Sequence, residues 1–145
     1  MDEVRKAALI TLCSQAITRF WAALDASDYE TVAKSMAPEG VWHRQGKALQ
    51  GPDGVRAALA ERPTGRVTAH MVQNLVVDLA DENTATARYF SLVYRHDAER
   101  APEGPVPLRD ALSISAVSDR LRRGPDGAWL VVERRSRPVF SAAAG

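Results

Sequence analysis

The chain has 145 residues, 46% of them hydrophobic and 26% charged, which is typical of a folded globular protein and excludes a disordered one. Its 19 Lys and Arg residues nearly balance 18 Asp and Glu residues, so the net charge of +1 gives no reason to expect nucleic acid as a partner. A single cysteine, Cys13, excludes an internal disulfide and a cysteine-based zinc site. We expect one domain over residues 1–145.

The first apolar stretch is too short to predict a membrane span. Its uncharged run covers residues 7–18, about a dozen, whereas a span needs about 20 apolar residues. The sequence therefore predicts a cytoplasmic protein with no membrane partner.

Two helices are predicted at the start of the chain. Apolar residues recur at three- and four-residue steps from Leu9 to Leu24, which predicts one long helix with a single buried face. The pattern from Ser27 to Glu30 fits a capping box and predicts the start of a second helix. We expect Pro38 to end that helix.

A short strand and a third helix follow. Residues 41–44 are expected to form the strand. The sequence Gly51-Pro52-Asp53 predicts a helix start, because proline is favoured in the first helical turn. The pair Arg62-Pro63 predicts its end.

The second half of the chain is predicted to form long strands, over residues 66–79, 84–96, 108–122 and 129–137. Strict two-residue alternation along the first of these would place His70 and Asn74 on the same face. A proline-rich loop is expected at 98–107, a tight hairpin at 124–127 and a frayed tail at 141–145.

Helices that precede strands, instead of alternating with them, indicate the α+β class. We expect three N-terminal helices in the concave face of a curved, mixed, mostly antiparallel sheet. Such a sheet leaves a cavity at its open end, where small ligands bind.

Four short strings, in this order, resemble the SnoaL-like branch of the NTF2-like superfamily; they lie at residues 23–29, 51–56, 70–74 and 126–129. The resemblance covers about residues 10–137. The resemblance implies a cone-shaped α+β barrel. That fold hosts isomerases, dehydratases, cyclases and non-catalytic binding proteins, so it does not by itself choose a function.

Asp25 and His70 are the predicted catalytic residues. Within the family the chain is most similar to the scytalone dehydratases, and this resemblance implies that Asp25 contacts a catalytic His70. Imidazole can accept a proton and return it, and burial would raise the pKa of a carboxyl toward a useful acid or base. The alternatives are that Asp25 only caps the break between two helices and that His70 only forms hydrogen bonds.

Further side chains are candidates for binding a substrate. Trp42 and Arg44 share one face of the short strand and suit a flat anionic or carbonyl-bearing ligand. Asn74 could polarise a carbonyl group, and either Tyr89 or Phe90 can face the cone. Trp42 and Arg44 could equally serve only as core packing and as a solvated charge.

Asp119 is the last candidate. The resemblance implies an acid/base role, because polyketide cyclases of the family use a strand Asp in about this region. The alternative is an ion pair across strands with Arg120, Arg122 or Arg134.

Two functions remain open from the sequence. One is a lyase, isomerase or cyclase that acts on an apolar carbonyl compound without metal or cofactor. The other is a non-catalytic binding protein or accessory subunit, because Leu24, Arg44 and Arg95 replace groups that the dehydratases use. Phe90, Leu92 and Tyr94 on one sheet face predict a homodimer.

Overall fold

A six-stranded sheet with strand order β2-β1-β6-β5-β4-β3 forms the centre of the fold. The computed structural model describes residues 1–142. In that range the helices are α1 (Glu3–Asp25), α2 (Tyr29–Lys34) and α3 (Gly51–Ala60). The strands are β1 (Met36–Arg44), β2 (Lys47–Gln50), β3 (Val67–Leu79), β4 (Thr84–His96), β5 (Ser113–Arg123) and β6 (Trp129–Ser141). β1 and β6 pair in parallel and the other pairs are antiparallel, so the predicted α+β class and mixed sheet are confirmed.

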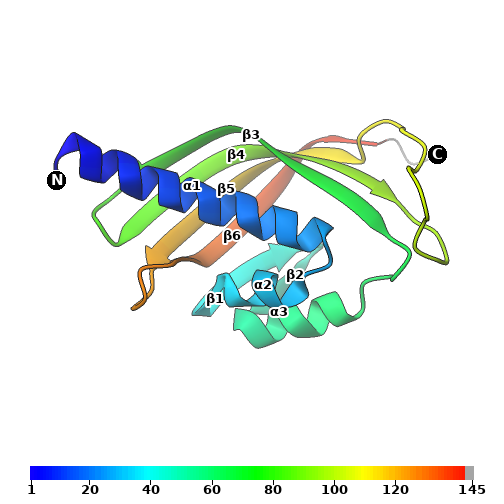
Figure 1. The fold of residues 1–145 in the computed structure, drawn as a ribbon, viewed down its shortest axis with the longest axis horizontal. Coiled ribbons are helices and arrows are strands. Elements are labelled where there is room, and N and C mark those ends of the chain that lie inside the picture. The colour runs from blue at the N-terminus through cyan, green and yellow to red at the C-terminus, as the bar shows by residue number, and fades with distance from the viewer. Residues whose placement is uncertain (143–145) are drawn as a thin grey trace.

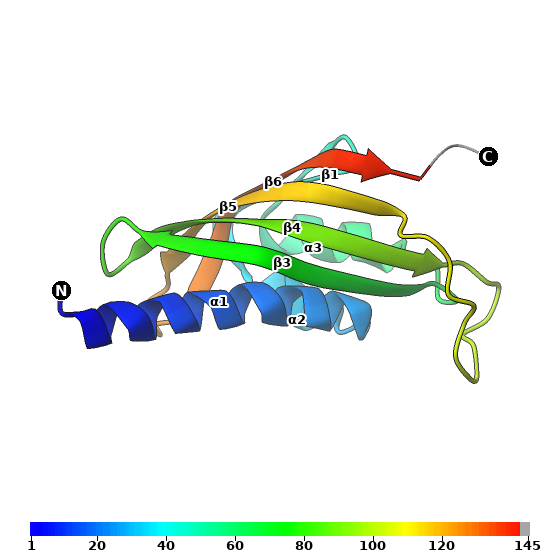
Figure 2. The same ribbon diagram turned by 90° about the horizontal axis from the view of Figure 1, so that it is seen from above.

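The long helix α1 lies along one face of the curved sheet (Figures 1 and 2). It begins at Asp2, whose carboxylate accepts a hydrogen bond from the backbone N–H of Arg5 at 2.8 Å. The predicted apolar face packs against the sheet, with Leu9, Cys13, Phe20 and Leu24 buried, and the unpredicted Ile17 is buried with them. These side chains form the core together with the inward residues of β3 to β6.

By length and composition alone, α1 is also apolar enough to cross a membrane, with a mean hydropathy of 1.3 in its most apolar stretch. That observation is weak, because the core helix of a globular domain passes the same test. Its buried face packs on the sheet, which is the pattern of a core helix.

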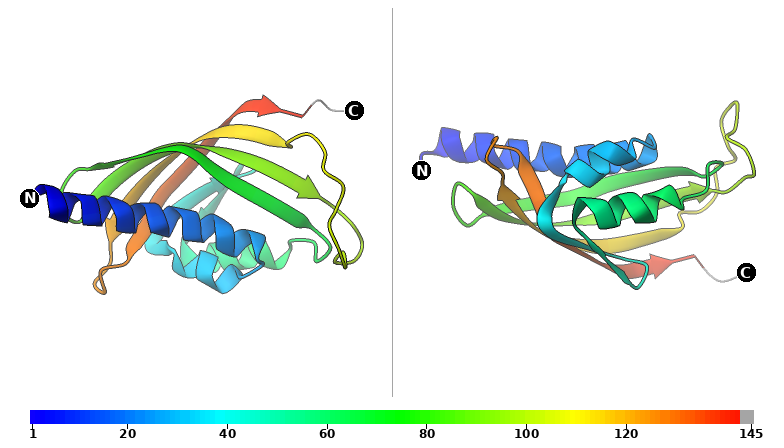
Figure 3. Two further views of the ribbon diagram at one scale, coloured as in Figure 1. Left: turned by 45° about the horizontal axis from the view of Figure 1, so that its top comes forward. Right: turned by 90° about the horizontal axis from the view of Figure 1, so that it is seen from below.

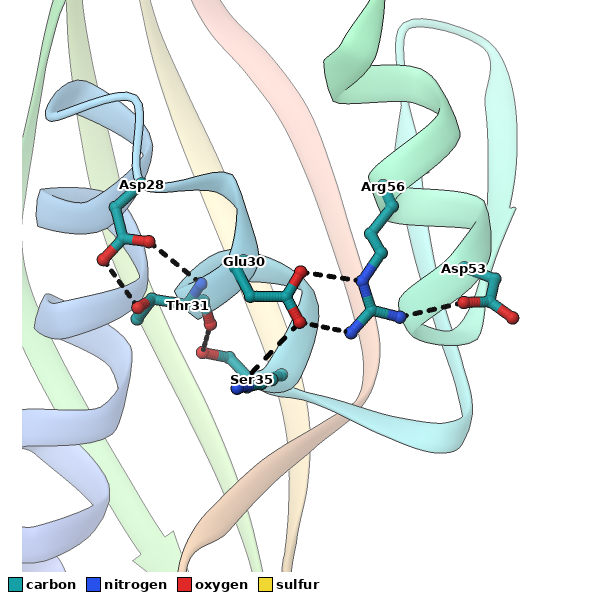
Figure 4. A network of polar contacts seen from close by, with 7 residues as sticks. Asp28, Glu30, Thr31, Ser35, Asp53 and Arg56 are labelled. Atoms are coloured by element: carbon teal, nitrogen blue, oxygen red, sulfur yellow. Dashed lines mark hydrogen bonds and ion pairs between the residues drawn. The ribbon is translucent and has the colours of Figure 1, made fainter.

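The turn between α1 and α2 departs from the predicted capping box. Ser27 adopts a positive φ of 58°, and the N–H of Asp28 donates to the carbonyl of Ala23 at 2.8 Å, which closes α1 in a Schellman-type end. Asp28, one residue later than predicted, caps α2 by accepting from the N–H of Thr31 at 3.2 Å (Figure 4). The predicted cap at Ser27 was wrong because Ser27, with its positive φ, forms the end of α1.

An exposed network joins α2 to α3, which lie side by side near the end of α1 (Figures 3 and 4). The guanidinium of Arg56 donates to Glu30 at 2.6 and 2.9 Å and to Asp53 at 2.8 Å. Exposed ion pairs add little stability. The network therefore connects the two short helices but contributes little to their stability.

The region around β1 corrects the sequence prediction twice. Pro38 does not end a helix but lies inside β1, where the pairing with β6 shifts register between Met36 and Val41. Proline is tolerated at such an irregularity because no ladder hydrogen bond is required there. The strand β2 was not predicted: it follows a tight turn in which Gln45 and Gly46 have φ values of 53° and 76°.

The ends of β5 and β6 also differ from the prediction. β5 begins at Ser113 and not at residue 108, and Leu108 is 89% exposed in the preceding loop. β6 continues through Pro138 to Ser141. Here β6 pairs with β5 alone, and an edge position accommodates the missing N–H of proline. The predicted tail at 141–145 thus begins within β6, and residues 143–145 lie outside the described range.

A bulge in β3 decides which of its side chains face α1. The pairing with β4 shifts register between Gln73 and Val76, and Asn74 has a φ of 56°. Before the bulge His70 faces inward, and after it the buried Val77 does. The predicted strict alternation was therefore wrong beyond Gln73.

Candidate active site

Asp25 and His70 form a hydrogen-bonded pair where the end of α1 meets β3. The Asp25 Oδ1 atom lies 2.6 Å from His70 Nδ1, and Oδ2 accepts the backbone N–H of His70 at 2.7 Å. The two side chains are only 21% and 11% exposed. The carboxylate of Asp25 thus bonds to β3, while the cap of α2 is Asp28.

Two further side chains hold this pair in place. The hydroxyl of Thr68 donates to Asp25 Oδ1 at 2.8 Å. The indole of Trp21 stacks on the imidazole of His70, with ring centroids 4.8 Å apart and planes 22° from parallel. The imidazole is therefore restrained both at its edge and on one face.

The hydrogen bonds determine the protonation of Asp25. Burial alone would raise its pKa, but the hydrogen bonds donated by His70 and Thr68 hold that pKa below the usual value of 3.8. The carboxyl group is thus ionised near neutral pH, contrary to the expectation of a raised pKa. An ionised carboxylate only accepts hydrogen bonds, so Nδ1 of His70 carries the hydrogen of this contact, and in the neutral imidazole the lone pair is then on Nε2.

A cavity of about 200 Å³ opens beside His70. Small hydroxyl and apolar side chains from α1, β1, β4 and β5 contribute to its wall, among them Trp21, Leu24, Trp42, Ser91, Val93, Ser115 and Val117. Among residues 1–142, none forms a hydrogen bond with Nε2 of His70. The volume is below the roughly 300 Å³ typical of sites for drug-sized ligands. A ligand with about one ring inside the cavity fits this space.

The strand β1 brings two of the predicted binding residues to the cavity. Trp42 packs edge-to-face on Phe20 and Trp21, with ring centroids 5.1 and 6.0 Å apart. The guanidinium of Arg44 lies over the ring of Trp42, 5.4 Å from its centroid. His43, between them, also borders the cavity and lies 3.3 Å from Glu133.

Tyr89 and Asp119 do not line the cavity but belong to a buried network beneath it. Asp119 accepts two hydrogen bonds from Arg134, at 2.8 and 2.7 Å, and one from the hydroxyl of Tyr89 at 3.0 Å. The Tyr89 hydroxyl also accepts from the indole N–H of Trp21 at 3.0 Å. Burial raises the pKa of Tyr89. Asp119 thus makes the ion pair with Arg134 that the sequence left open.

Arg134 itself is enclosed. Its guanidinium lies 4.1 Å from the centroid of Phe20 and 4.8 Å from that of Trp21. Burial alone would lower its pKa, but the charge of Asp119 outweighs burial and raises it. The side chain therefore remains a cation inside the core.

Asn74 is not brought to the site. It is exposed, and its positive φ places it at the bulge of β3. Asparagine adopts this backbone conformation more readily than most residues. The backbone conformation at the bulge thus explains why asparagine suits position 74. Within residues 1–142 no group of three His, Cys, Asp or Glu side chains is arranged to hold a metal ion.

Several cavity residues were not predicted. Thr68 supports Asp25, and Arg62, Arg66 and Arg95 line the cavity. Arg62 was interpreted only as part of a helix end, and Arg95 only as the replacement of a group that the dehydratases use. Thr68 and Arg66 carry no local pattern. Alternation along β3 did place Thr68 on the face of His70, and this was the available signal.

Comparison with known proteins identifies the family. The sequence profile of the SnoaL-like domain matches residues 5–135. The chain belongs to the SnoaL-like family. The match confirms the resemblance predicted from the four strings. The curved sheet is consistent with the cone-shaped fold that the resemblance implied, but it is not closed into a barrel. No curated protein sequence matched the chain.

Solved structures share the fold. A Catenulispora acidiphila protein in complex with S-DNPA is 26% identical, with 91% of this chain and 94% of that chain covered and a TM-score of 0.69. ActVI-ORFA from Streptomyces coelicolor is 19% identical over 89% and 96% of the two chains, with a TM-score of 0.73. A putative scytalone dehydratase from Novosphingobium aromaticivorans is 18% identical over 89% and 83%, with a TM-score of 0.72.

Proposed function

We propose that this SnoaL-like protein is a cytoplasmic, cofactor-independent lyase, isomerase or cyclase that acts on a small, mostly apolar carbonyl compound. The observation that carries the proposal is the 2.6 Å contact between Asp25 and His70 Nδ1 at the edge of a cavity. This contact leaves Nε2 free to exchange a proton with a bound molecule. His70 is the proposed catalytic residue, and Asp25 is a positioning residue that acts through it.

The shared first step is proton removal beside a carbonyl group. Nε2 of His70 takes a proton from the carbon next to the carbonyl, and the electrons of that C–H bond form the enolate. In a dehydration, the imidazolium then returns the proton to a hydroxyl on the following carbon, which leaves as water while a C=C bond forms. In an isomerisation or aldol cyclisation, the proton returns to carbon or to the new alkoxide. Nothing is oxidised or reduced.

The comparisons support small-molecule chemistry of this kind without naming the reaction. One similar protein is described in complex with S-DNPA and another as a putative scytalone dehydratase. The step above is compatible with several reaction classes, so the experiment addresses the step and not a particular product.

Deuterium exchange is the direct test. The protein is incubated in D₂O with a phenyl-substituted β-hydroxy ketone, and NMR follows both loss of the proton next to the carbonyl and loss of water. We expect His70→Gln to slow exchange by about 100-fold to 10,000-fold, and Asp25→Asn by about 10-fold to 100-fold. His96→Gln is the matched control, because this histidine lies on β4 outside the cavity.

A wild-type protein that exchanges no proton of the probe, or a His70→Gln variant as fast as wild type, contradicts the proposal. The second candidate function is a binding module without catalysis. It is favoured by Arg44 and Arg95, which border the cavity where the dehydratases were expected to have a phenol and a second histidine. That function predicts unchanged ligand affinity in His70→Gln and no exchange in any variant.

We also propose that the protein is a homodimer that pairs through the outer face of its sheet. Met71, Leu92, Ile114 and Phe140 are successive partners across β3, β4, β5 and β6, so they form one apolar row. Met71 is 40% and Phe140 66% exposed. An apolar row of this extent is typical of a covered surface.

Light scattering at micromolar concentration tests the dimer. We expect the mass of a dimer for the wild type and of a monomer for Phe90→Glu, because Phe90 lies on the same face and is 37% exposed. Thr86→Glu, on the same face of β4 but away from the apolar row, should remain dimeric. A monomeric wild type contradicts the proposal.

A further inference from the structure

The charge around the cavity is strongly one-sided. Four arginines border it, Arg44, Arg62, Arg66 and Arg95, and among residues 1–142 no Asp or Glu side chain does. They come from β1, the connection between α3 and β3, and β4. Segments far apart in the chain thus converge to place positive charge around one opening.

Three of these arginines are already held by other groups. Arg62 donates to the carbonyl of Leu24 at 2.9 Å and to the hydroxyl of Thr68. Arg66 and Arg95 share Asp97, at 2.7 and 3.2 Å. Their donors are largely directed at the protein itself.

Arg44 differs from the other three. Among residues 1–142 it forms no ion pair or hydrogen bond, and its guanidinium rests on the ring of Trp42. Burial, followed by repulsion from Arg62 and Arg66, lowers the pKa of the Arg44 guanidinium. A half-buried charge without an opposite charge is unfavourable, and an anion supplied by a ligand would relieve it.

The arginines around the cavity are linked to the proposed chemistry through Arg62. Arg62 donates to Thr68, Thr68 donates to Asp25, and Asp25 contacts His70. The cationic rim and the proton-transfer pair are therefore parts of one connected site. A molecule held at the rim would present its other end to the cavity beside His70.

We propose that the ligand carries a carboxylate that binds the guanidinium of Arg44, with its flat apolar part in the cavity. This inference rests on the proposed function, because it specifies the substrate of the same site. A planar carboxylate matches the donor fork of a single arginine. A phosphate group takes donors from several side chains at once, and the other three arginines have theirs engaged.

Binding of three one-ring probes tests the carboxylate. Benzoate, benzamide and phenyl phosphate are titrated calorimetrically against the full chain. We expect benzoate to bind about 10-fold to 100-fold more tightly than benzamide, because a hydrogen bond to a charged group is stronger than one to a neutral group. Arg44→Gln should remove this preference by weakening benzoate binding far more than benzamide binding. Arg44→Lys, which keeps the charge but not the fork, should retain part of it.

Arg88→Gln is the matched control, since Arg88 is an exposed arginine on the same sheet that pairs with Asp78. It should keep the full preference for benzoate. Thermal unfolding checks that each variant is folded. If Arg44→Gln does not fold, Arg44→Lys still provides the test.

Four results would overturn the inference: no benzoate binding, equal affinity for benzoate and benzamide, tighter binding of phenyl phosphate, or an unchanged preference in Arg44→Gln. The outcome is separate from that of the proposed function. His70→Gln should keep the preference for benzoate while losing proton exchange. A preference that depends on Arg44 in a protein without any exchange supports the anion site and contradicts the enzyme.

Discussion

The buried ion pair between Asp119 and Arg134 makes a quantitative prediction. Replacing Arg134 with Met keeps a long side chain in the core but removes the cation. Asp119, whose side chain is 0% exposed, then keeps only the hydrogen bond from Tyr89. It loses two charge-assisted hydrogen bonds of 2.8 and 2.7 Å.

Each of those bonds contributes about 1.5–3 kcal/mol, so the two together give roughly 3–6 kcal/mol. This agrees with the about 3–5 kcal/mol lost when one partner of a buried pair is removed. The double variant Asp119→Leu with Arg134→Met removes the uncompensated charge. It should lose only about 1–3 kcal/mol, chiefly because the Tyr89 hydroxyl then lacks its acceptor.

Urea denaturation, followed by tryptophan fluorescence and circular dichroism, measures these differences in the free energy of unfolding. Arg135→Met is the matched control, because the neighbouring Arg135 is 63% exposed and should change stability very little. The reasoning fails if Arg134→Met is no less stable than Arg135→Met. It fails equally if the losses of Arg134→Met and Asp119→Leu, each measured singly, simply add in the double variant.

Three other predictions concern single residues. Asp25→Asn should reduce the free energy of unfolding. Because the pKa of Asp25 in the folded protein is lowered from 3.8, the greater stability of the wild type should persist above pH 3.8 and shrink as the pH falls below it. Urea titrations at a series of pH values measure this difference. Burial, reinforced by the charge of Asp119, raises the pKa of the Cys13 thiol to about 12. A disulfide reagent at pH 8 should therefore modify Cys13 only after denaturant is added. Rapid modification of the native protein would contradict this burial. Gly51→Ala should cost about 1–3 kcal/mol in thermal or urea unfolding, because Gly51 has a φ of 62° and an added Cβ would lie 2.7 Å from the carbonyl oxygen of Pro38; an unchanged midpoint would refute it.

The order of helices and strands could be predicted because its signals are local. The apolar ladder from Leu9 to Leu24 follows from helical geometry, and the long strands follow from alternation. The errors lie where tertiary pairing overrides those signals. The bulge at Asn74 is set by register with β4, and the turn at Gln45-Gly46 lacks the Asn-Gly pattern that predicts such hairpins.

The candidate site was only partly predictable. Asp25 and His70 were paired through the family resemblance, since 45 positions separate them and no spacing rule connects them. Of the arginines around the cavity, only Arg44 was predicted to bind a ligand, and their convergence was not predicted. Arg44, Arg62 and Arg95 lie on three separate segments, and their convergence depends on how the sheet curves.

Trp21 connects the two polar networks of the protein. Its indole N–H donates to the hydroxyl of Tyr89, and its ring stacks on His70. The guanidinium of Arg134 lies over the same ring, 4.8 Å from its centroid. The ion pair beneath the cavity therefore helps to set the position of the tryptophan that restrains the imidazole. Arg134→Met should therefore slow the proton exchange of the probe as well as reduce stability, although Arg134 lies outside the cavity lining. Measuring exchange at a temperature where the variant is still fully folded separates this positioning effect from simple unfolding, because only the positioning effect persists there.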